Sequence, residues 1–324
     1  MKEQSRAPVA QPAPSRANPQ QRHVEHAGLT WIDIIEPTVA HVQYLRERYA
    51  FDPLALEDVL SQVQRPKLDS FPQNEYLFIV LQFPVLDKDQ RVAGAGELDL
   101  FVGRDYVITL HDGGLKPLRR MFTAASSDEH ARAQLMGRGP GYLLYRLVDA
   151  LVKQTFPLLD HVDAAIARAE ERAYADDARQ AIRDLANVRQ DTIALRHIIA
   201  PNLAVARAIE AGDHPFLRLN QASYFGDLAD GLATLVDILE EQNETVAGLR
   251  ATLDSLAMQR MREGVRLLLA ITLALLPMIL VATIFSMNLP LPVASIPFIF
   301  PIALLLMIGA AAGMIAFARY KQWI

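Results

Sequence analysis

The side chains that could do chemistry in this 324-residue chain do not form a catalytic set. The sequence has no glycine-rich nucleotide loop, no GxSxG nucleophile motif and no HExxH zinc motif. Cysteine is absent, which excludes disulfides and thiolate metal sites. The eight histidines include no pair at ligand spacing on one predicted helix: His23, His26, His41, His111, His130, His161, His197 and His214. We therefore expect neither an enzyme nor a resident cofactor.

The most informative polar residues interrupt a long stretch without charge. From Leu267 to Ala318 no residue is charged, and Ser286-Met287-Asn288 breaks the apolar pattern near the middle. A helix needs about 20 apolar residues to cross a bilayer, so the stretch predicts two membrane spans joined by a tight turn. Only Thr272, Thr283 and Ser286 carry hydroxyl groups in the first span, which suits a narrow and largely apolar pore.

Basic residues flank both predicted spans. Arg260, Arg262 and Arg266 precede the first span, Arg319 and Lys321 follow the second, and the connecting loop has no charge. The positive-inside rule therefore places both ends of the chain in the cytoplasm. Two helices surrounded by lipid cannot enclose an aqueous path, so transport would require several copies of the chain.

The part before the spans is predicted to be cytosolic. Residues 1–28 are rich in Pro, Gln, Ala and Arg, which predicts a disordered arm. Residues 29–140 contain short runs rich in Val, Ile and Phe between turn residues, as is typical of an α/β domain. Residues 141–215 show 3.6-residue spacing, which predicts two long antiparallel helices. The net charge of −5, without a basic stripe among aromatics, gives no sign of nucleic-acid binding.

One continuous helix is predicted over residues 216–286, and its last part, from about residue 265, is the first span. Its apolar positions alternate by four and three for about four heptads: Leu228, Leu232, Leu235, Leu239, Gln242, Val246, Leu249, Leu253 and Leu256. Packing on the two preceding helices explains this seam, as does packing with copies of the chain, and both can apply to different parts. The chain then continues as a loop (287–292), a second span (293–318) with a GxxxG packing surface at Gly309 to Gly313, and a basic tail (319–324).

The order of these parts resembles the CorA family of divalent-cation transporters. The long helix ends in Pro277-x8-Ser286-Met287-Asn288. The pore helix of the family ends in a signature of the same type. Further motifs match in register: Trp31-Ile32-Asp33, Pro53 to Leu60, Arg65 to Asp69, Tyr142 to Tyr145 with Asp149 to Leu151, and Tyr224 to Asp227. The resemblance covers residues 30–324. It implies a funnel-shaped homopentamer in a bacterial inner membrane, in contact with lipid and divalent cations, with the first span lining the pore.

The resemblance also implies where the ion is handled. The signature is Ser286, Met287 and Asn288, and a ring of Asn288 carboxamides would receive a hydrated ion, because magnesium is usually met through its waters. The alternative is that Asn288 only caps the turn. The candidates that would line the pore are Arg262, Val265, Leu269, Thr272, Leu276, Ile279 and Thr283.

A regulatory site is implied in the cytosolic part. Asp58 and Asp227, with Glu57 adjacent, fall on the positions where an acid of one subunit meets an acid of the next and binds a divalent ion. Such an ion would draw the subunits together and favour closure. The alternative is that these acids are ordinary surface charges or helix caps, since Asp227 stands at a helix start.

Three departures from the family pattern leave the transported ion open. Ser286 replaces a glycine, the loop from Leu289 to Pro297 has no acid, and Arg262 stands where relatives often have Asn. Magnesium is the default ion that we expect. The first alternative is zinc or another transition metal, as in the ZntB branch. The second alternative is a pentameric membrane scaffold that does not conduct.

Overall fold

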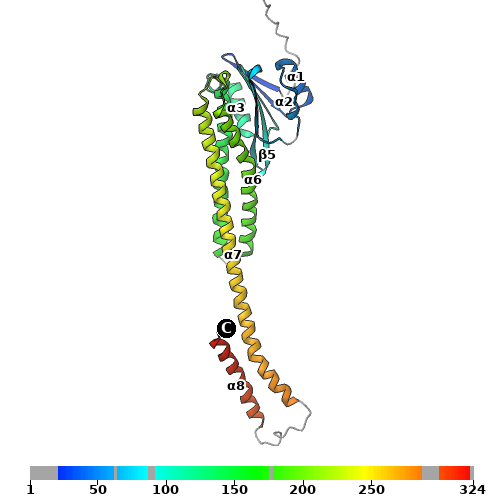
Figure 1. The fold of residues 1–324 in the computed structure, drawn as a ribbon, viewed down its shortest axis with the longest axis vertical. Coiled ribbons are helices and arrows are strands. Elements are labelled where there is room, and N and C mark those ends of the chain that lie inside the picture. The colour runs from blue at the N-terminus through cyan, green and yellow to red at the C-terminus, as the bar shows by residue number, and fades with distance from the viewer. Residues whose placement is uncertain (1–20, 62–63, 87–91, 175–177, 287–298, 322–324) are drawn as a thin grey trace, which may run out of the picture. The chain divides into compact units, whose positions relative to one another are not determined.

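The computed structural model describes residues 21–61, 64–86, 92–174, 178–286 and 299–321 (Figure 1). The chain divides into two compact units, Met1–Ala247 and Gly248–Ile324. The first unit contains a six-stranded sheet and most of the helices. The second contains the last part of a 66-residue helix and one further helix. This is the combination of an α/β domain with long helices that the sequence predicts.

A mixed sheet forms the centre of the first unit. Its strands are β1 (Gln21–His26), β2 (Leu29–Ile35), β3 (Lys67–Phe71), β4 (Tyr76–Leu86), β5 (Val92–Gly103) and β6 (Tyr106–His111). Their order is β1-β2-β6-β5-β4-β3, and every neighbouring pair is antiparallel except β2 and β6.

The first strand corrects one prediction. Residues 21–26 belong to the sheet, so a disordered arm that extends to residue 28 is wrong. β1 pairs with β2 through a two-residue turn in which Ala27 and Gly28 have positive φ values of 50° and 80°. Turns of this kind match the twist of antiparallel strands and favour glycine. The first 20 residues of the predicted arm lie outside the described residues.

Two short helices cover one face of the sheet. They are α1 (Val39–Tyr49) and α2 (Pro53–Asp58), and apolar residues of both pack on Phe78, Phe101 and Ile108. The Asp52 side chain caps α2 by accepting a hydrogen bond from the Leu54 N–H at 2.8 Å. These contacts fix the end of α2, which carries Asp58.

The other helices of the first unit include α3 (Lys116–Ser127), α4 (Glu129–Met136), α5 (Pro140–Tyr174) and α6 (Ala178–Ala211). The fully buried Trp31 ring packs edge-on against Phe122 of α3, with ring centroids 4.8 Å apart. On α6, the buried Asn202 side chain accepts from the Gln82 N–H at 3.1 Å and donates to the Gln82 carbonyl at 2.6 Å. The Asn202 amide thus forms hydrogen bonds with the backbone N–H and carbonyl of Gln82, beyond the part of β4 that pairs with β3. These bonds join α6 to the sheet.

The long helix α7 (Gln221–Ser286) begins in the first unit. There, all six residues of the predicted heptad seam are buried: Leu228, Leu232, Leu235, Leu239, Gln242 and Val246. Gln242 donates to the Leu159 carbonyl at 3.1 Å and to Asp163 Oδ1 at 2.8 Å on α5. For this part of the seam, packing on a preceding helix is therefore confirmed. Packing between copies of the chain stays a prediction for the later part, in which Leu253 is buried and Leu256 is 40% exposed.

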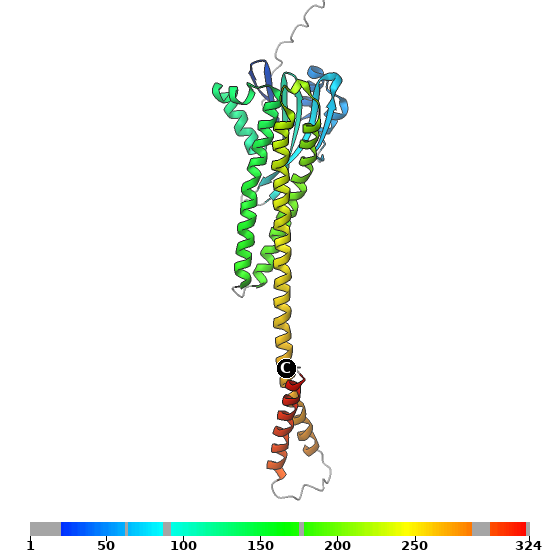
Figure 2. The same cartoon turned by 60° about the vertical axis from the view of Figure 1, so that its left-hand side comes forward.

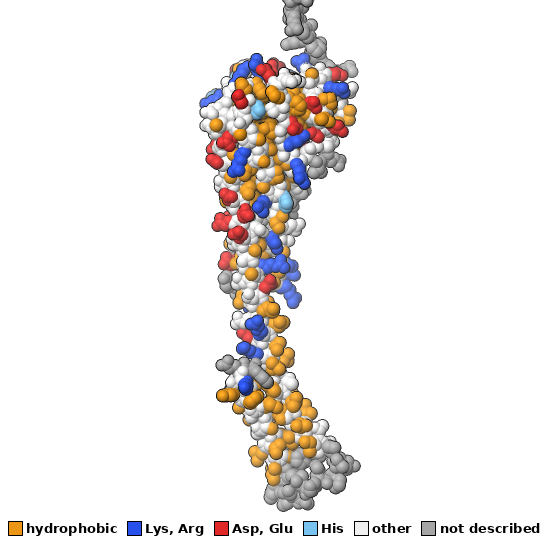
Figure 3. Space-filling model, viewed as in Figure 1, with side chains coloured by type: hydrophobic (Ala, Val, Ile, Leu, Met, Phe, Trp, Pro, Cys, Tyr) orange, Lys and Arg blue, Asp and Glu red, His pale blue; other side chains and the backbone are white. Residues whose placement is uncertain are grey.

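In the second unit the rest of α7 lies beside α8 (Ile299–Tyr320) (Figures 1 and 2). Both helices are long and apolar enough to cross a membrane. Hydrophobic side chains dominate the face of this unit that Figure 3 shows. α8 continues to Tyr320, two residues past the predicted end of the second span. The loop over 287–292, residues 293–298 of the second span and residues 322–324 of the tail lie outside the described residues.

Candidate functional site

A stripe of exposed residues runs along the last part of α7. All seven residues predicted to line a pore are exposed, from Arg262 to Thr283. Their spacing is 3, 4, 3, 4, 3 and 4, so they lie on one face of the helix. We call these residues the α7 stripe: Arg262, Val265, Leu269, Thr272, Leu276, Ile279 and Thr283.

The face of α7 away from the stripe is covered within the chain. Pro277 and Val281 are buried on this part of α7, and Ala311 and Ala318 are buried on α8. At 100° per residue, Pro277 and Val281 lie more than 100° from the centre of the stripe. Within the described part of one chain the stripe is therefore uncovered, and α8 lies beside this part of α7 (Figures 1 and 2).

The two threonines of the stripe have defined hydrogen bonds. Thr272 Oγ1 donates to the Leu268 carbonyl at 2.8 Å, and Thr283 Oγ1 donates to the Ile279 carbonyl at 2.6 Å. Because each hydroxyl hydrogen is used within the helix, each oxygen keeps its lone pairs for other donors. Both oxygens can therefore accept hydrogen bonds from water molecules, on a stripe that is otherwise apolar from Val265 onward.

The N-terminal end of the stripe is cationic. Arg262 is exposed and forms no ion pair within the described part of the chain. Glu263, the acid next to Arg262 in the sequence, accepts a hydrogen bond from the Gln259 amide at 3.3 Å. Neutralisation of Arg262 within one subunit is therefore not seen in the described residues, and a neighbouring subunit or lipid headgroups are left as its counterions.

At the C-terminal end, α7 stops at the signature. Ser286 is the last residue of the helix and is exposed. It lies three residues after Thr283 and therefore continues the spacing of the stripe. Met287 and Asn288 lie outside the described residues.

The GxxxG surface of α8 does not pack against any other described residue of the chain. A Cβ atom placed on Gly309 or Gly313 would meet nothing within 4 Å. Both glycines lie on the opposite side of α8 from the buried Ala311 and Ala318, as the 100° spacing requires. The predicted surface is thus open to lipid or to another subunit.

The three candidates for the regulatory site come from two elements. Asp58, at the end of α2, accepts from Lys67 Nζ at 2.5 Å and from Gln64 Nε2 at 3.0 Å. Asp227, in the first turns of α7, is exposed and accepts from the Tyr145 hydroxyl at 3.2 Å. Glu57 is exposed. Among the described residues of one chain, no group of three or more acids or histidines is arranged to hold a metal ion. A site shared between subunits stays a prediction.

One buried acid near Asp58 was not predicted from the sequence. Asp99 of β5 is 3% exposed, and its Oδ1 atom is buried with no hydrogen-bond partner among the residues that the structure describes. Burial raises the pKa of Asp99 well above its usual value, and the nearby carboxylates of Glu97 and Asp58 raise it further, whereas Lys67 opposes the change. β5 has no alternation that could mark this residue, because Leu98, Leu100 and Phe101 are all buried beside it.

Replacement of Asp99 by Asn is expected to make thermal stability less dependent on pH. Since the pKa of Asp99 is raised by folding, its contribution to stability is full below about pH 4 and is lost as the pH rises through the folded-state pKa. An amide does not ionise, so Asp99→Asn should melt about 3 °C or more above the wild type at pH 8, with a smaller difference at pH 5. The melting temperature of each protein is measured in detergent as a function of pH, with Asp230→Asn, at an exposed position, as the control. Equal pH profiles of the melting temperature for wild type and Asp99→Asn would contradict the prediction.

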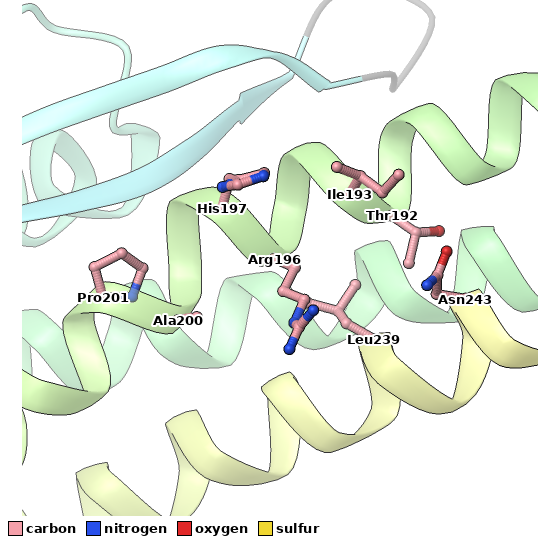
Figure 4. Close-up of a pocket in the computed structure, with 8 residues that line it drawn as sticks. All are labelled: Thr192, Ile193, Arg196, His197, Ala200, Pro201, Leu239 and Asn243. Atoms are coloured by element: carbon pink, nitrogen blue, oxygen red, sulfur yellow. The ribbon is translucent and has the colours of Figure 1, made fainter.

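A separate pocket lies between α6 and α7 within the first unit (Figure 4). It measures about 240 Å³, and its lining includes Arg196, His197, Leu239 and Asn243. Arg196 is already paired with Glu240 at 3.5 Å, and no described candidate residue for ion handling lines the pocket. We assign no part of ion handling to it.

Comparison with known proteins gives consistent matches over most of the chain. Residues 26–319 match the family model described as CorA-like Mg2+ transporter protein. The putative metal ion transporter YfjQ of Bacillus subtilis (strain 168) is 27% identical over 297 residues, which cover 90% of this chain and 89% of the relative. The cobalt/magnesium transport protein CorA of Thermotoga maritima is 26% identical over 303 residues, covering 91% and 83%.

The fold is similar to that of a solved transporter. The complete structure of the CorA magnesium transporter from Methanocaldococcus jannaschii superimposes with a TM-score of 0.76 and 19% sequence identity. The match covers 91% of this chain and 92% of that chain. At this identity the likeness concerns the fold, including the long helix and the helix that follows it.

Proposed function

The chain belongs to the CorA family of divalent-cation transporters, and from this we propose that it carries magnesium across a bacterial inner membrane through a pore built by five copies of itself. The family consists of transporters and not of enzymes, which agrees with the absence of catalytic motifs from the sequence. The chain is therefore a metal-ion transporter with two candidate membrane helices.

The observation that carries the proposed pathway is the α7 stripe. Its residues are exposed in the single chain, keep heptad spacing from Arg262 to Thr283, and face away from the side of α7 that is buried. Copies of α7 can surround a common axis when each turns a regular, uncovered face of this kind toward that axis. In such an assembly α8 would face outward, and the axis could form the aqueous path. Each copy would contribute one ring of side chains at each stripe position.

The assembly is tested by its mass. Five subunits of 36.0 kDa should give one dominant species in mild detergent and in membrane-derived nanodiscs, as measured by native mass spectrometry. A monomer or dimer as the only species under both conditions would contradict a pore lined by α7, because two apolar helices cannot enclose an aqueous path.

The choice of ion rests on the ring that we propose for Asn288. Magnesium releases its waters reluctantly, and neutral carboxamide oxygens can hydrogen-bond those waters without trapping the ion. Zinc or another transition metal is the alternative, since Ser286 and the acid-free loop depart from the magnesium pattern. Liposomes with magnesium-sensitive or zinc-sensitive dye should show the faster flux for magnesium. Faster zinc flux would favour the alternative, and no flux of either ion would favour the scaffold.

We further propose that Asp58 and Asp227 of neighbouring subunits bind a regulatory divalent ion. Asp227 is exposed, and the Asp58 side chain is 24% exposed, with one oxygen paired with Lys67 and the other accepting from Gln64, so an ion would replace these two partners. Replacing both with Asn should raise magnesium flux at millimolar internal magnesium, because a ligand shifts an equilibrium only by its differential affinity for the two states. The increase should vanish without internal divalent ions. Equal protection from protease by magnesium in wild type and double variant would show that these acids are not the sensor.

A further inference from the structure

A basic hollow lies on the first unit, apart from the residues proposed to handle the cation. It is formed by α3 and β1 and has a volume of about 680 Å³. Four cationic residues line it: Arg22, Lys116, Arg119 and Arg120. No carboxylate is among its described lining residues. We call this set the α3 basic cluster.

Three of these cations are uncompensated. Lys116, Arg119 and Arg120 are exposed, and their side chains make no hydrogen bond or ion pair within the described part of the chain. Their positions within five residues of one helix keep the charges close together. Like charges at this spacing repel one another, and a bound anion would remove that repulsion.

Arg22 is different, because it is fixed. Its guanidinium pairs with the fully buried Asp33 and lies 4.6 Å from the centroid of the Phe122 ring. Asp33 is held in turn by Thr109 Oγ1 at 2.8 Å and by His111 Nε2 at 3.1 Å. Burial acts to raise the pKa of Asp33, but its contacts with His111, Thr109 and Arg22 lower the pKa overall, so the carboxylate stays ionised. The hollow therefore has one guanidinium held in place by Asp33, and its Nε atom is buried with no hydrogen-bond partner among the described residues.

The start of α3 adds to the positive potential. Leu115 precedes the helix and provides no side-chain cap, and the first turn has no acidic residue. The unpaired N–H groups and the helix dipole make this end positive, and acids are the residues that usually stabilise it. Here Lys116 and Arg119 stand at that end instead. The arrangement is unfavourable for the empty protein and favourable for an anion.

We propose that the α3 basic cluster binds a free small molecule with two or more phosphate groups. Three uncompensated cations match the charge of a di- or triphosphate better than that of a single phosphate, and guanidinium groups bind phosphate oxygens in pairs. The described lining has no exposed aromatic ring on which a nucleic-acid base could stack, and the cluster is confined to one hollow formed by α3 and β1, which disfavours nucleic acid. This inference goes beyond ion transport and does not depend on it.

Calorimetric titration of the full-length protein in detergent tests the proposal. Sodium tripolyphosphate is the probe, and EDTA is present so that no divalent cation is titrated. The wild type should bind it, and Lys116→Gln/Arg119→Gln/Arg120→Gln should bind at least about tenfold more weakly. The charge-matched control Arg168→Gln/Arg189→Gln/Arg207→Gln removes three exposed arginines from α5 and α6 and should keep wild-type affinity. The charge-preserving variant Lys116→Arg/Arg119→Lys/Arg120→Lys should retain binding within a few fold.

Several results would overturn the proposal. One is the absence of binding by the wild type, and another is equal weakening in the control, which would show a general effect of net charge. A third is loss of the oligomer in the Gln variant but not in the control, since the cations would then serve contacts between subunits. A fourth is binding of wild-type protein to phosphatidylglycerol vesicles through these residues without any binding of tripolyphosphate, because the source of phosphate would then be a lipid surface.

Discussion

Replacement of Asn288 by Ala is expected to abolish divalent-cation flux while the pentamer stays intact. The ring of carboxamides that we propose at the end of α7 would be lost, and a methyl group cannot accept a hydrogen bond from the water around an ion. One side chain in a loop contributes little to folding, so the melting temperature should change by about 3 °C or less. Flux should fall by at least about tenfold in liposomes with equal protein content.

A matched variant separates this role from simple capping of the turn. Asn288→Asp keeps an acceptor oxygen and the capping ability of the side chain, but adds a ring of charge. If Asn288 receives the ion, Asn288→Asp should retain flux and slow the release of divalent ions, whereas Asn288→Ala should not conduct. Unchanged flux in Asn288→Ala would sink the assignment and leave the carboxamide with a structural role only.

Replacement of Thr272 by Trp is expected to close the pore. Thr272 lies in the middle of the α7 stripe, so five indole rings would meet at one level of the proposed axis. The apolar lining there has no other route for a hydrated ion, and flux should fall by at least about tenfold. The adjacent Ile271 is 48% exposed but lies 100° away around the helix, where lipid is expected.

Ile271→Trp is therefore the matched control, because it adds the same side chain one residue away. It should conduct within a few fold of the wild type, and both variants should retain the mass of the wild-type oligomer. Block by Ile271→Trp with normal flux in Thr272→Trp would mean that the pore-facing side of α7 has been assigned wrongly.

Much of the fold could be predicted because it follows from periodicity. The heptad seam from Leu228 to Val246 and the uncharged stretch after Leu267 specify a helix that is first amphipathic and then apolar, and α7 is continuous through both. The exposed α7 stripe follows from the same spacing. The chain around it is an α/β domain because short β-branched runs alternate with turns.

The misses have local causes. β1 is polar at most positions and is an edge strand, so its pairing depends on a two-residue turn at Ala27-Gly28 and not on any apolar pattern. Asp99 was missed because a single acid in a strand says nothing about which face is covered until α2 and the sheet are seen together. The α3 basic cluster escaped notice for a similar reason, since β1 supplies Arg22 from a segment predicted to be disordered.

The central claim is that the α7 stripe lines the pathway of the ion, and cysteine accessibility measures this most directly. The chain has no cysteine, so single Cys variants can be made without any background change. Magnesium flux is followed in liposomes before and after a small cationic methanethiosulfonate reagent is added. The reagent should block flux through variants with Cys at the stripe positions Val265, Leu269, Thr272, Leu276, Ile279 and Thr283. It should not block flux through the variant with Cys at Val281, which lies on the buried side of α7. Block at Val281 with no effect along the stripe would contradict the account.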